Sequence, residues 1–272
     1  MARSRAEFFR RIPLANQLGG SSRELAVQIM RCPVLAECVE KDGHRRGCYE
    51  VATGPGGPHS AKWVPEPWVG HLTEAPLLFV SSNPGGGRDP SDDPEDPSSA
   101  SSDEILLACQ DKAFDEDQRP GITDGAYLVN RHGVPGKWVP YWGWARRRAE
   151  ELLLRSVFAG HDYALSEVVH CGGPGQAGVA AALSTCVERY LEKVLAASPS
   201  RVVIVVGKFG REGFNHGFHL ALHYGLVGPI ELSGRERLLI TVPHPNSRGG
   251  PKSLSAHLSR EQLAQARKAL VD

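Results

Sequence analysis

The chain has 272 residues, of which 41% are hydrophobic and 23% charged, with 31 basic and 31 acidic residues. This length can bury one sizeable core, and no apolar run approaches the roughly 18 residues that span a bilayer. The basic start, MARSRAEFFRR, lacks the apolar stretch of a secretory signal, so we expect one cytoplasmic domain over residues 1–272 with no membrane partner. Zero net charge is a mild argument against a nucleic-acid binder, although the acidic residues cluster between Asp89 and Glu104 and leave the rest net basic.

Residues 1–74 are predicted to form an irregular, cysteine-containing segment that packs on the domain. Within it, Ser21 or Ser22 can cap a helix that runs to about Met30. The apolar run APLLFVSS at Ala75–Ser82 then predicts a buried strand of a parallel sheet. Residues 86–104 are acidic and rich in proline and serine, so we expect a mobile insertion there.

Alternating strand and helix patterns continue to the end of the chain. Segments 126–130 and 137–140 predict a hairpin, and the strands that follow are expected at 163–170, 201–206 and 237–242. Helices are expected at 103–114, 141–158, 179–197, from 207 onward and at 258–271. The sequence therefore predicts a single α/β domain with a mostly parallel, four-stranded central sheet flanked by helices.

Two further patterns lie in the helix that is expected to begin at Gly207. Gly207, Gly210 and Gly213 lack the spacing and the Lys–Ser/Thr pair of phosphate-binding loops, which favours tight packing of this helix on the sheet. His216, His219 and His223 would share one helix face, but the first and last would lie about 10 Å apart along the axis, too far to bind one metal ion.

Two of the predicted strands end in similar polar segments, SSNPGG at 81–86 and PHPNSR at 243–248. In open α/β sheets, ligands bind at the carboxyl ends of strands, so Asn83 and His244 are expected to meet in one crevice. An asparagine amide can hold a water molecule, and a histidine can stabilise an anionic leaving group. The alternative is that Asn-Pro-Gly and His-Pro are ordinary loop residues.

These segments carry a resemblance to a known family. The strand followed by SSNPG resembles the first motif of the uracil-DNA glycosylase superfamily, and HPNSR resembles its second motif. The segment from EVVHC to Cys186, with fourteen residues between Cys171 and Cys186, is similar to the iron–sulfur branch; the resemblance spans about Cys32 to Asn246. It implies a monofunctional DNA glycosylase of base excision repair that removes a damaged base from DNA. It also implies a monomer without a diffusible cofactor, in the bacterial cytoplasm with the nucleoid.

The resemblance also implies roles for single residues. Asn83 would position or activate the attacking water, and His244 would stabilise the departing base. The implied base-binding residues are Ser82, Glu167 and an aromatic side chain that stacks on the base. Phe114, Tyr127 and Tyr141 are candidates for this side chain, and we take Phe114 as the prediction. The implied DNA-binding residues are Pro84, Gly85, Pro245, Asn246, Ser247 and Arg248.

Glu167 departs from the family pattern, which has an asparagine that reads the base edge at this position. An amide offers a donor and an acceptor, which suits uracil, whereas an ionised carboxylate only accepts and suits a base with two donors, such as guanine. A protonated Glu167 in a buried pocket would instead mimic the amide. A structural carboxylate is the third reading.

The resemblance implies a 4Fe–4S cluster, held by Cys32, Cys38, Cys171 and Cys186, with Cys48 as an alternative ligand. A zinc ion at the same positions, or free thiols, are the other readings of these cysteines. Two other functions stay open for the whole chain. One is a catalytically inactive member of the fold that binds damaged or single-stranded DNA, and the other is an unrelated nucleotide-binding α/β protein.

Overall fold

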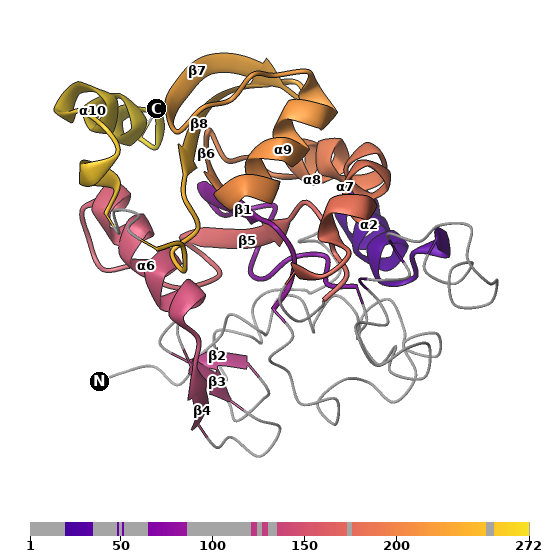
Figure 1. Cartoon of the computed structure of the whole chain (residues 1–272). Helices are drawn as coiled ribbons and strands as arrows, with labels where there is room; N and C mark the ends of the chain where they lie inside the picture. The colour runs from indigo at the N-terminus through magenta and orange to yellow at the C-terminus, as the bar shows by residue number, and fades with distance from the viewer. Residues whose placement is uncertain are drawn as a thin grey trace.

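A five-stranded sheet forms the centre of the molecule (Figure 1). The computed structural model describes residues 20–34, 48, 51, 65–85, 121–123, 127–129, 135–172, 176–248 and 253–271. The strand order is β5-β1-β6-β8-β7. The bounds are Leu77–Ser81 for β1, Tyr163–Glu167 for β5, Val202–Val206 for β6, Gly225–Leu232 for β7 and Arg235–Val242 for β8. The first four strands in this order are parallel, which confirms the α/β class and the mostly parallel sheet.

The predicted count of four strands is wrong, because β7 adds a fifth strand antiparallel to β8. Gly225, Gly228 and Pro229 lie within β7, and residues of these types weaken a strand pattern. The pairing of β7 with β8 is interrupted between Val227 and Ile230. Pro229 is tolerated because β7 is an edge strand, where one side of the backbone has no partner strand.

Helices cover both faces of the sheet, because alternate residues of each buried strand point to opposite sides. On one side, Leu78 and Val80 pack in a cluster that includes residues of α2 (Gly20–Met30), α7 (Val179–Cys186), α8 (Glu192–Ala197) and α9 (Gly207–Phe218). On the other side, Leu77 and Phe79 pack with residues of α6 (Pro140–Leu153) and α10 (Arg260–Ala269). A π-helical turn, Val187–Leu191, joins α7 to α8, and a 3-10 turn, Leu254–Ala256, precedes α10.

A small antiparallel sheet precedes α6 in the chain. Its strands are β2 (Gly121–Thr123), β3 (Tyr127–Val129) and β4 (Pro135–Trp138), in that order. The pairing of β3 with β4 confirms the predicted hairpin. Figure 1 shows this sheet at the beginning of α6, so it leads the chain directly into the helix that carries Tyr141.

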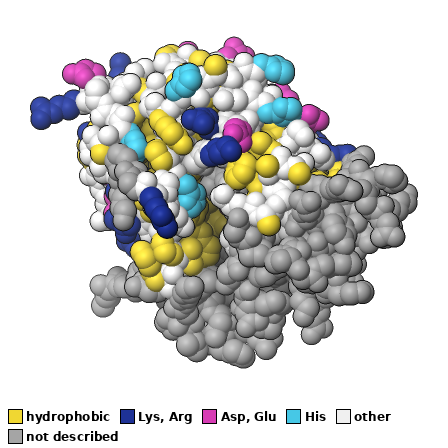
Figure 2. All heavy atoms as spheres, viewed as in Figure 1, with side chains coloured by type: hydrophobic (Ala, Val, Ile, Leu, Met, Phe, Trp, Pro, Cys, Tyr) yellow, Lys and Arg dark blue, Asp and Glu magenta, His cyan; other side chains and the backbone are white. Residues whose placement is uncertain are grey.

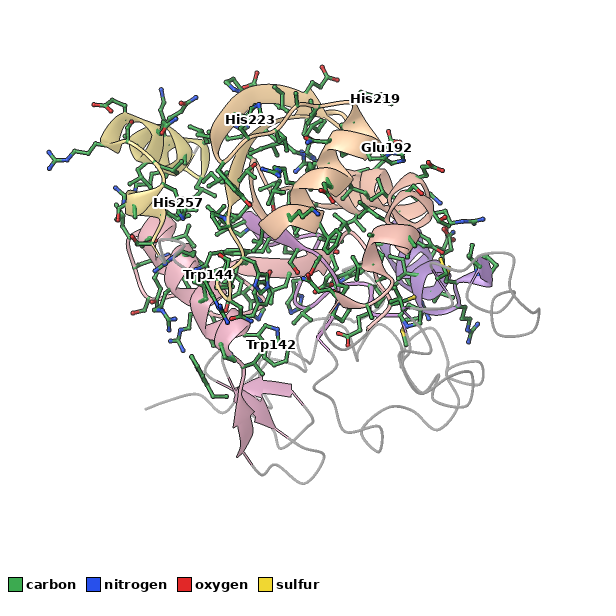
Figure 3. All side chains as sticks on the ribbon, in the orientation of Figure 1. Trp142, Trp144, Glu192, His219, His223 and His257 are labelled. Atoms are coloured by element: carbon green, nitrogen blue, oxygen red, sulfur yellow. The ribbon has the colours of Figure 1, made fainter. Side chains whose placement is uncertain are left out.

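The three glycines of α9 let this helix approach the sheet closely, which confirms the expected tight packing. A Cβ atom at Gly213 would lie 2.6 Å from Val168, and one at Gly210 would lie 3.1 Å from the Val80 carbonyl oxygen. The predicted histidine row is not formed, because α9 ends at Phe218 and His219 has a left-handed backbone with φ 53°. His219 and His223 lie apart from each other in Figure 3.

Several predictions fall outside the described residues, namely those on residues 1–19, on the insertion at 86–104, on the helix that follows it to residue 114, and on Cys38 and Phe114. In the described part of the N-terminal segment, Ile29, Val51 and Trp68 belong to the same hydrophobic cluster as Phe214 of α9. No helix among the described residues is long and apolar enough to cross a membrane.

Candidate functional site

A cavity of about 730 Å³ opens at the carboxyl edge of the parallel strands. All four of these strands contribute to it through the residues at or after their ends: Asn83 after β1, Glu167 at the end of β5, Gly207 after β6 and His244 after β8. The structure therefore places the two residues predicted to be catalytic on the wall of one cavity, where strand-end segments of an open α/β sheet are expected to meet.

The turn after β8 holds the His244 ring in one tautomer. The main-chain N–H of Asn246 donates to Nδ1 of His244 at 3.2 Å. The same turn is closed by Ser247, whose N–H and hydroxyl both donate to the His244 carbonyl, at 2.8 and 2.7 Å. Burial lowers the pKa of His244 below its usual value. A neutral ring that accepts at Nδ1 carries its proton on Nε2, so His244 is a hydrogen-bond donor through Nε2–H.

Tyr141 packs flat against His244 and limits its movement. The two ring centroids are 5.7 Å apart and the ring planes differ by 5°. Pro140, which favours the start of a helix, places Tyr141 in the first turn of α6. The Tyr141 hydroxyl is buried beside Ser81 without a well-formed hydrogen bond, and burial raises its pKa well above the usual range. The phenol is therefore neutral at physiological pH, and it serves as a rigid support for the imidazole.

Gly207 lies close to His244 because it has no side chain. Its φ is +78°, and a Cβ atom here would lie 3.2 Å from the His244 Cβ. We expect Gly207→Ala to lower the free energy of unfolding by about 1–2 kcal/mol, because a left-handed backbone disfavours a side chain. It should also displace His244 and reduce the activity proposed below.

Gly234→Ala is the matched control for this change. Gly234 also has a positive φ, +75°, but a Cβ atom there would meet nothing within 4 Å. Thermal unfolding should show similar losses of stability in both variants, while only Gly207→Ala loses activity. Equal activity in the two variants would contradict a positioning role for Gly207.

Asn83 and Ser82 also line the cavity. Asn83 is only 9% exposed, and its Nδ2 atom donates to the Pro84 carbonyl at 3.2 Å. The side-chain amide of Gln176 donates to the Ser82 hydroxyl at 2.8 Å. Beyond the end of β1, the N–H groups of Val168 and Val169 donate to the carbonyls of Ser81 and Ser82. These bonds fix the Asn83 segment against the segment that follows Glu167.

Glu167 is the last residue of β5 and pairs in register with Ser81. It is half-buried and lines the cavity, so its carboxylate belongs to the same site as Asn83 and His244. Its negative charge also contributes to the raised pKa of Tyr141. The structure thus brings Ser82, Asn83, Glu167 and His244 together, as the sequence predicts.

No protein-family model matches this chain, and no curated protein matches it. The arrangement of the site is therefore the main support for a function.

Gln176 and Trp142 are among the lining residues that the sequence patterns missed. Gln176 follows a run of glycines and a proline, and no motif marks it as a partner of Ser82. Trp142 follows Tyr141 in the first turn of α6, where Figure 3 labels it, and also lines the cavity. Tyr141 is one of the three aromatic residues that the sequence offers as candidates. Its contact with His244 depends on tertiary packing, which the spacing of residues along the chain does not reveal.

Four of the six predicted DNA-binding residues line the cavity, while Pro245 and Arg248 are not among its lining residues. Pro84, Gly85, Asn246 and Ser247 line it, while Arg248 is exposed beside them, and Lys208 adds a positive charge at the start of α9. Figure 2 shows basic side chains standing among hydrophobic and uncharged ones on this face, without a broad basic patch over the part that the structure describes. The mixed surface agrees with the balanced charge of the chain.

A second, small cavity of about 20 Å³ lies on the side of the sheet that α2 and α7 cover, and four cysteines line it: Cys32, Cys48, Cys171 and Cys186. The main-chain N–H of His170 donates to the Cys186 sulfur at 3.4 Å. Burial raises the pKa of the Cys186 thiol to about 12. A bare thiolate is therefore disfavoured here, and a bound cation would reverse this preference.

This set differs in one position from the four ligands that the sequence predicts, because Cys48 lines the cavity and Cys38 lies outside the described residues. Among the described residues, no three His, Cys, Asp or Glu side chains are arranged around a single metal ion. A single ion requires every sulfur about 2.3 Å from one point, whereas a cluster binds each thiolate through a different iron atom. Four thiols around one cavity, one of them accepting an N–H, fit the donor set of a cluster.

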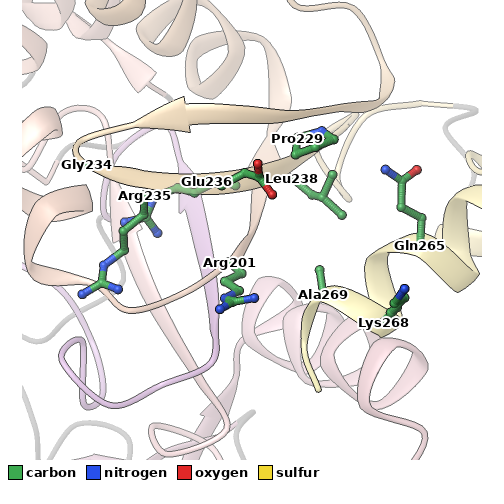
Figure 4. Close-up of a pocket in the computed structure, with 10 residues that line it drawn as sticks. Arg201, Pro229, Gly234, Arg235, Glu236, Leu238, Gln265, Lys268 and Ala269 are labelled. Atoms are coloured by element: carbon green, nitrogen blue, oxygen red, sulfur yellow. The ribbon is translucent and has the colours of Figure 1, made fainter. Parts of the chain in front are cut away.

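A third cavity, of about 560 Å³, lies at the opposite edge of the sheet (Figure 4). It is lined by residues at the beginnings of β6 and β8 and on α10, among them Arg201, Arg235, Glu236 and Lys268. Arg235 and Lys268 stand at opposite sides of it in Figure 4, so their charges do not converge on one ligand position. We assign no chemistry to this cavity.

Proposed function

We propose that this protein is a DNA glycosylase that hydrolyses the N-glycosidic bond of a damaged base. The observation that carries the proposal is that Asn83 and a neutral His244, whose Nε2–H is a donor, line the same cavity. The motif resemblance to the uracil-DNA glycosylase superfamily gives independent support from the sequence. The cavity also has the size of a typical ligand site, roughly 300–1,000 Å³.

The reaction needs both groups. The oxygen of a water molecule, held by the Asn83 amide, forms a bond to the sugar C1′. The bond between C1′ and the base nitrogen breaks, and its electron pair leaves with the base as an anion. The Nε2–H of His244 donates a hydrogen bond to that anion, which lowers the energy of the transition state. The water retains one proton as the new sugar hydroxyl, and its second proton passes through solvent to the departed base.

The reacting base must leave the DNA stack to reach this cavity, because a stacked base exposes neither face of its glycosidic bond. The exposed turn at 246–248 and the segment Pro84–Gly85 flank the opening and suit contacts to the DNA backbone. Arg248 and Lys208 supply positive charge near the phosphates on either side of the extruded nucleotide.

The test uses oligonucleotides that carry uracil, hypoxanthine, xanthine or 8-oxoguanine, single-stranded and opposite each base. After incubation with the protein, alkali cleaves the strand wherever a base has been lost. Strand cleavage at one or more of these bases is the expected result. Base-dependent binding without any release would favour the catalytically inactive, DNA-binding alternative.

We also propose that Cys32, Cys48, Cys171 and Cys186 hold a 4Fe–4S cluster, which would cross-link the N-terminal segment to the end of β5 and to α7. We expect protein isolated without oxygen, or reconstituted with iron and sulfide, to show the broad visible absorption of such a cluster. Cys48→Ala and Cys186→Ala should lose this absorption and bound iron. Cys38→Ala is the matched control and should retain both; the reverse result for Cys38 and Cys48 would contradict this ligand set.

A further inference from the structure

Glu167 is held at a fixed position relative to the reacting groups. It pairs in register with Ser81, two residues before Asn83, on the neighbouring strand. The ladder continues past it, since the Val168 N–H donates to the Ser81 carbonyl at 2.9 Å and the Val169 N–H donates to the Ser82 carbonyl at 3.0 Å. The carboxylate therefore projects from an ordered strand end and not from a loose loop. A group held in this way can read the shape and polarity of a bound base.

Charge and hydrogen bonding define what Glu167 can read. The raised pKa of Tyr141 includes a contribution from the negative charge of Glu167, so this charge acts inside the cavity. An ionised carboxylate has two acceptor oxygens and no donor. The base edge that meets Glu167 must therefore supply the hydrogen atoms.

The bases differ in this respect. The pairing edge of uracil has one N–H between two carbonyl oxygens, so a carboxylate would gain one hydrogen bond and face at least one lone pair. The pairing edge of guanine has N1–H and the exocyclic N2–H₂ side by side, which match two carboxylate oxygens in parallel. Paired, charge-assisted hydrogen bonds of this kind are the strong ones.

We infer that Glu167 makes this site specific for a guanine-type base, such as an oxidised guanine, over uracil. The inference rests on the proposed function for its substrate, since it names the base that the same cavity takes. The rest of the lining is compatible with a bicyclic base, because the cavity is about 730 Å³ and carries the aromatic side chains of Tyr141, Trp142 and Phe209. Loss of one hydrogen bond to a charged group costs about 1.5–3 kcal/mol, which corresponds to roughly 10- to 150-fold in affinity.

The experiment measures binding and release separately for DNA that carries 8-oxoguanine or uracil. Binding is followed by fluorescence anisotropy with the Asn83→Ala variant, which is expected to bind DNA without releasing the base. Release of the base is followed with the parent protein. We expect at least tenfold tighter binding of 8-oxoguanine than of uracil. When Glu167→Gln is combined with Asn83→Ala, it exchanges one acceptor for a donor at nearly constant size, and we expect it to reverse or abolish this preference. Glu74→Gln, an exposed glutamate outside the cavity, is the matched control and should leave it unchanged.

Equal or tighter binding of uracil, or a preference that survives Glu167→Gln, would overturn the inference. If Glu167→Gln melts at a lower temperature than the parent, Glu167→Asp provides the second test, because it retains both acceptors and should retain the preference in weakened form. The two proposals fail in different ways. Preferential binding of 8-oxoguanine without release of any base would support the inference about Glu167 and contradict the proposed glycosylase activity. Release of uracil without any preference for 8-oxoguanine would support the glycosylase activity and contradict the inference about Glu167.

Discussion

Replacing Asn83 by alanine should slow base release by roughly 100- to 10,000-fold, the range over which a positioned catalytic group acts. The side chain is almost fully buried on the cavity wall, and its segment is fixed by main-chain bonds to the strand next to it. Loss of the amide removes the group that orients the attacking water, while the hydrogen bond to Pro84 that disappears with it is local. We therefore expect a large loss of rate with a small change in melting temperature.

The measurement is single-turnover release of the preferred base, with enzyme in excess over DNA, so that chemistry is separated from product release. Asn215→Ala is the matched control, because the Asn215 side chain also bonds to the main chain, accepting from the Leu222 N–H at 2.8 Å, but lies outside the cavity. This variant is expected to lose stability and keep its rate. A rate for Asn83→Ala within tenfold of the parent would rule out the role that we assign to Asn83.

His244→Ala should reduce release by roughly 100- to 1,000-fold, because it removes a donor aimed at the developing negative charge. His223→Ala, which changes an exposed histidine outside the cavity, is the control and should have no effect. His244→Gln should recover part of the loss, since an amide N–H also donates. If His244→Ala and His223→Ala behave alike, the departing base does not depend on His244.

The pH dependence follows from the pKa of His244, which burial lowers below its usual value of 6.5. Above that value the ring is neutral in both the folded and the unfolded chain, and the site is intact. As the pH falls through the lowered pKa, Nδ1 takes up a proton and faces the Asn246 N–H, which had been its donor. The release rate and the contribution of this turn to stability should therefore be present at neutral pH and be lost in acid.

A pH–rate profile tests this directly. The parent protein should lose activity on the acid side with an apparent pKa below 6.5, and His244→Gln should lack this loss because glutamine does not titrate in that range. An acid limb that is unchanged in His244→Gln would assign the titration to another group.

The patterns of single segments predicted the fold better than they predicted the details of the site. The continuous apolar runs of β1 and β6 are buried on both faces, so their sequence signal is strong. The edge strand β7 is only partly buried and contains two glycines besides a proline, so its signal is weak. The pairing of Asn83 with His244 could be predicted because the carboxyl ends of parallel strands share one edge.

Other features of the site depend on tertiary geometry. The contact of Tyr141 with His244 joins the first turn of α6 to the end of β8, and nothing in the spacing of these residues indicates it. Gln176 reaches Ser82 from a segment with a left-handed backbone, φ 62°, that no motif marks. The choice between Cys38 and Cys48 stayed open in the sequence, because no periodic pattern around them indicates which one faces the core. The structure places Cys48 beside the other three cysteines.

Because the four parallel strands share one edge, the cavity can form only when the sheet is complete, and this has a consequence for folding and unfolding. Asn83 and His244 lie far apart in the chain, and they meet only when β6 is inserted between β1 and β8. Parallel strands have no local pairing on which to build, so the sheet must close long loops before the cavity exists. No partly folded chain that lacks the central strand can hold the two groups together. A ligand that occupies the cavity consequently stabilises the entire sheet, and its binding should shift the cooperative unfolding transition of the whole domain.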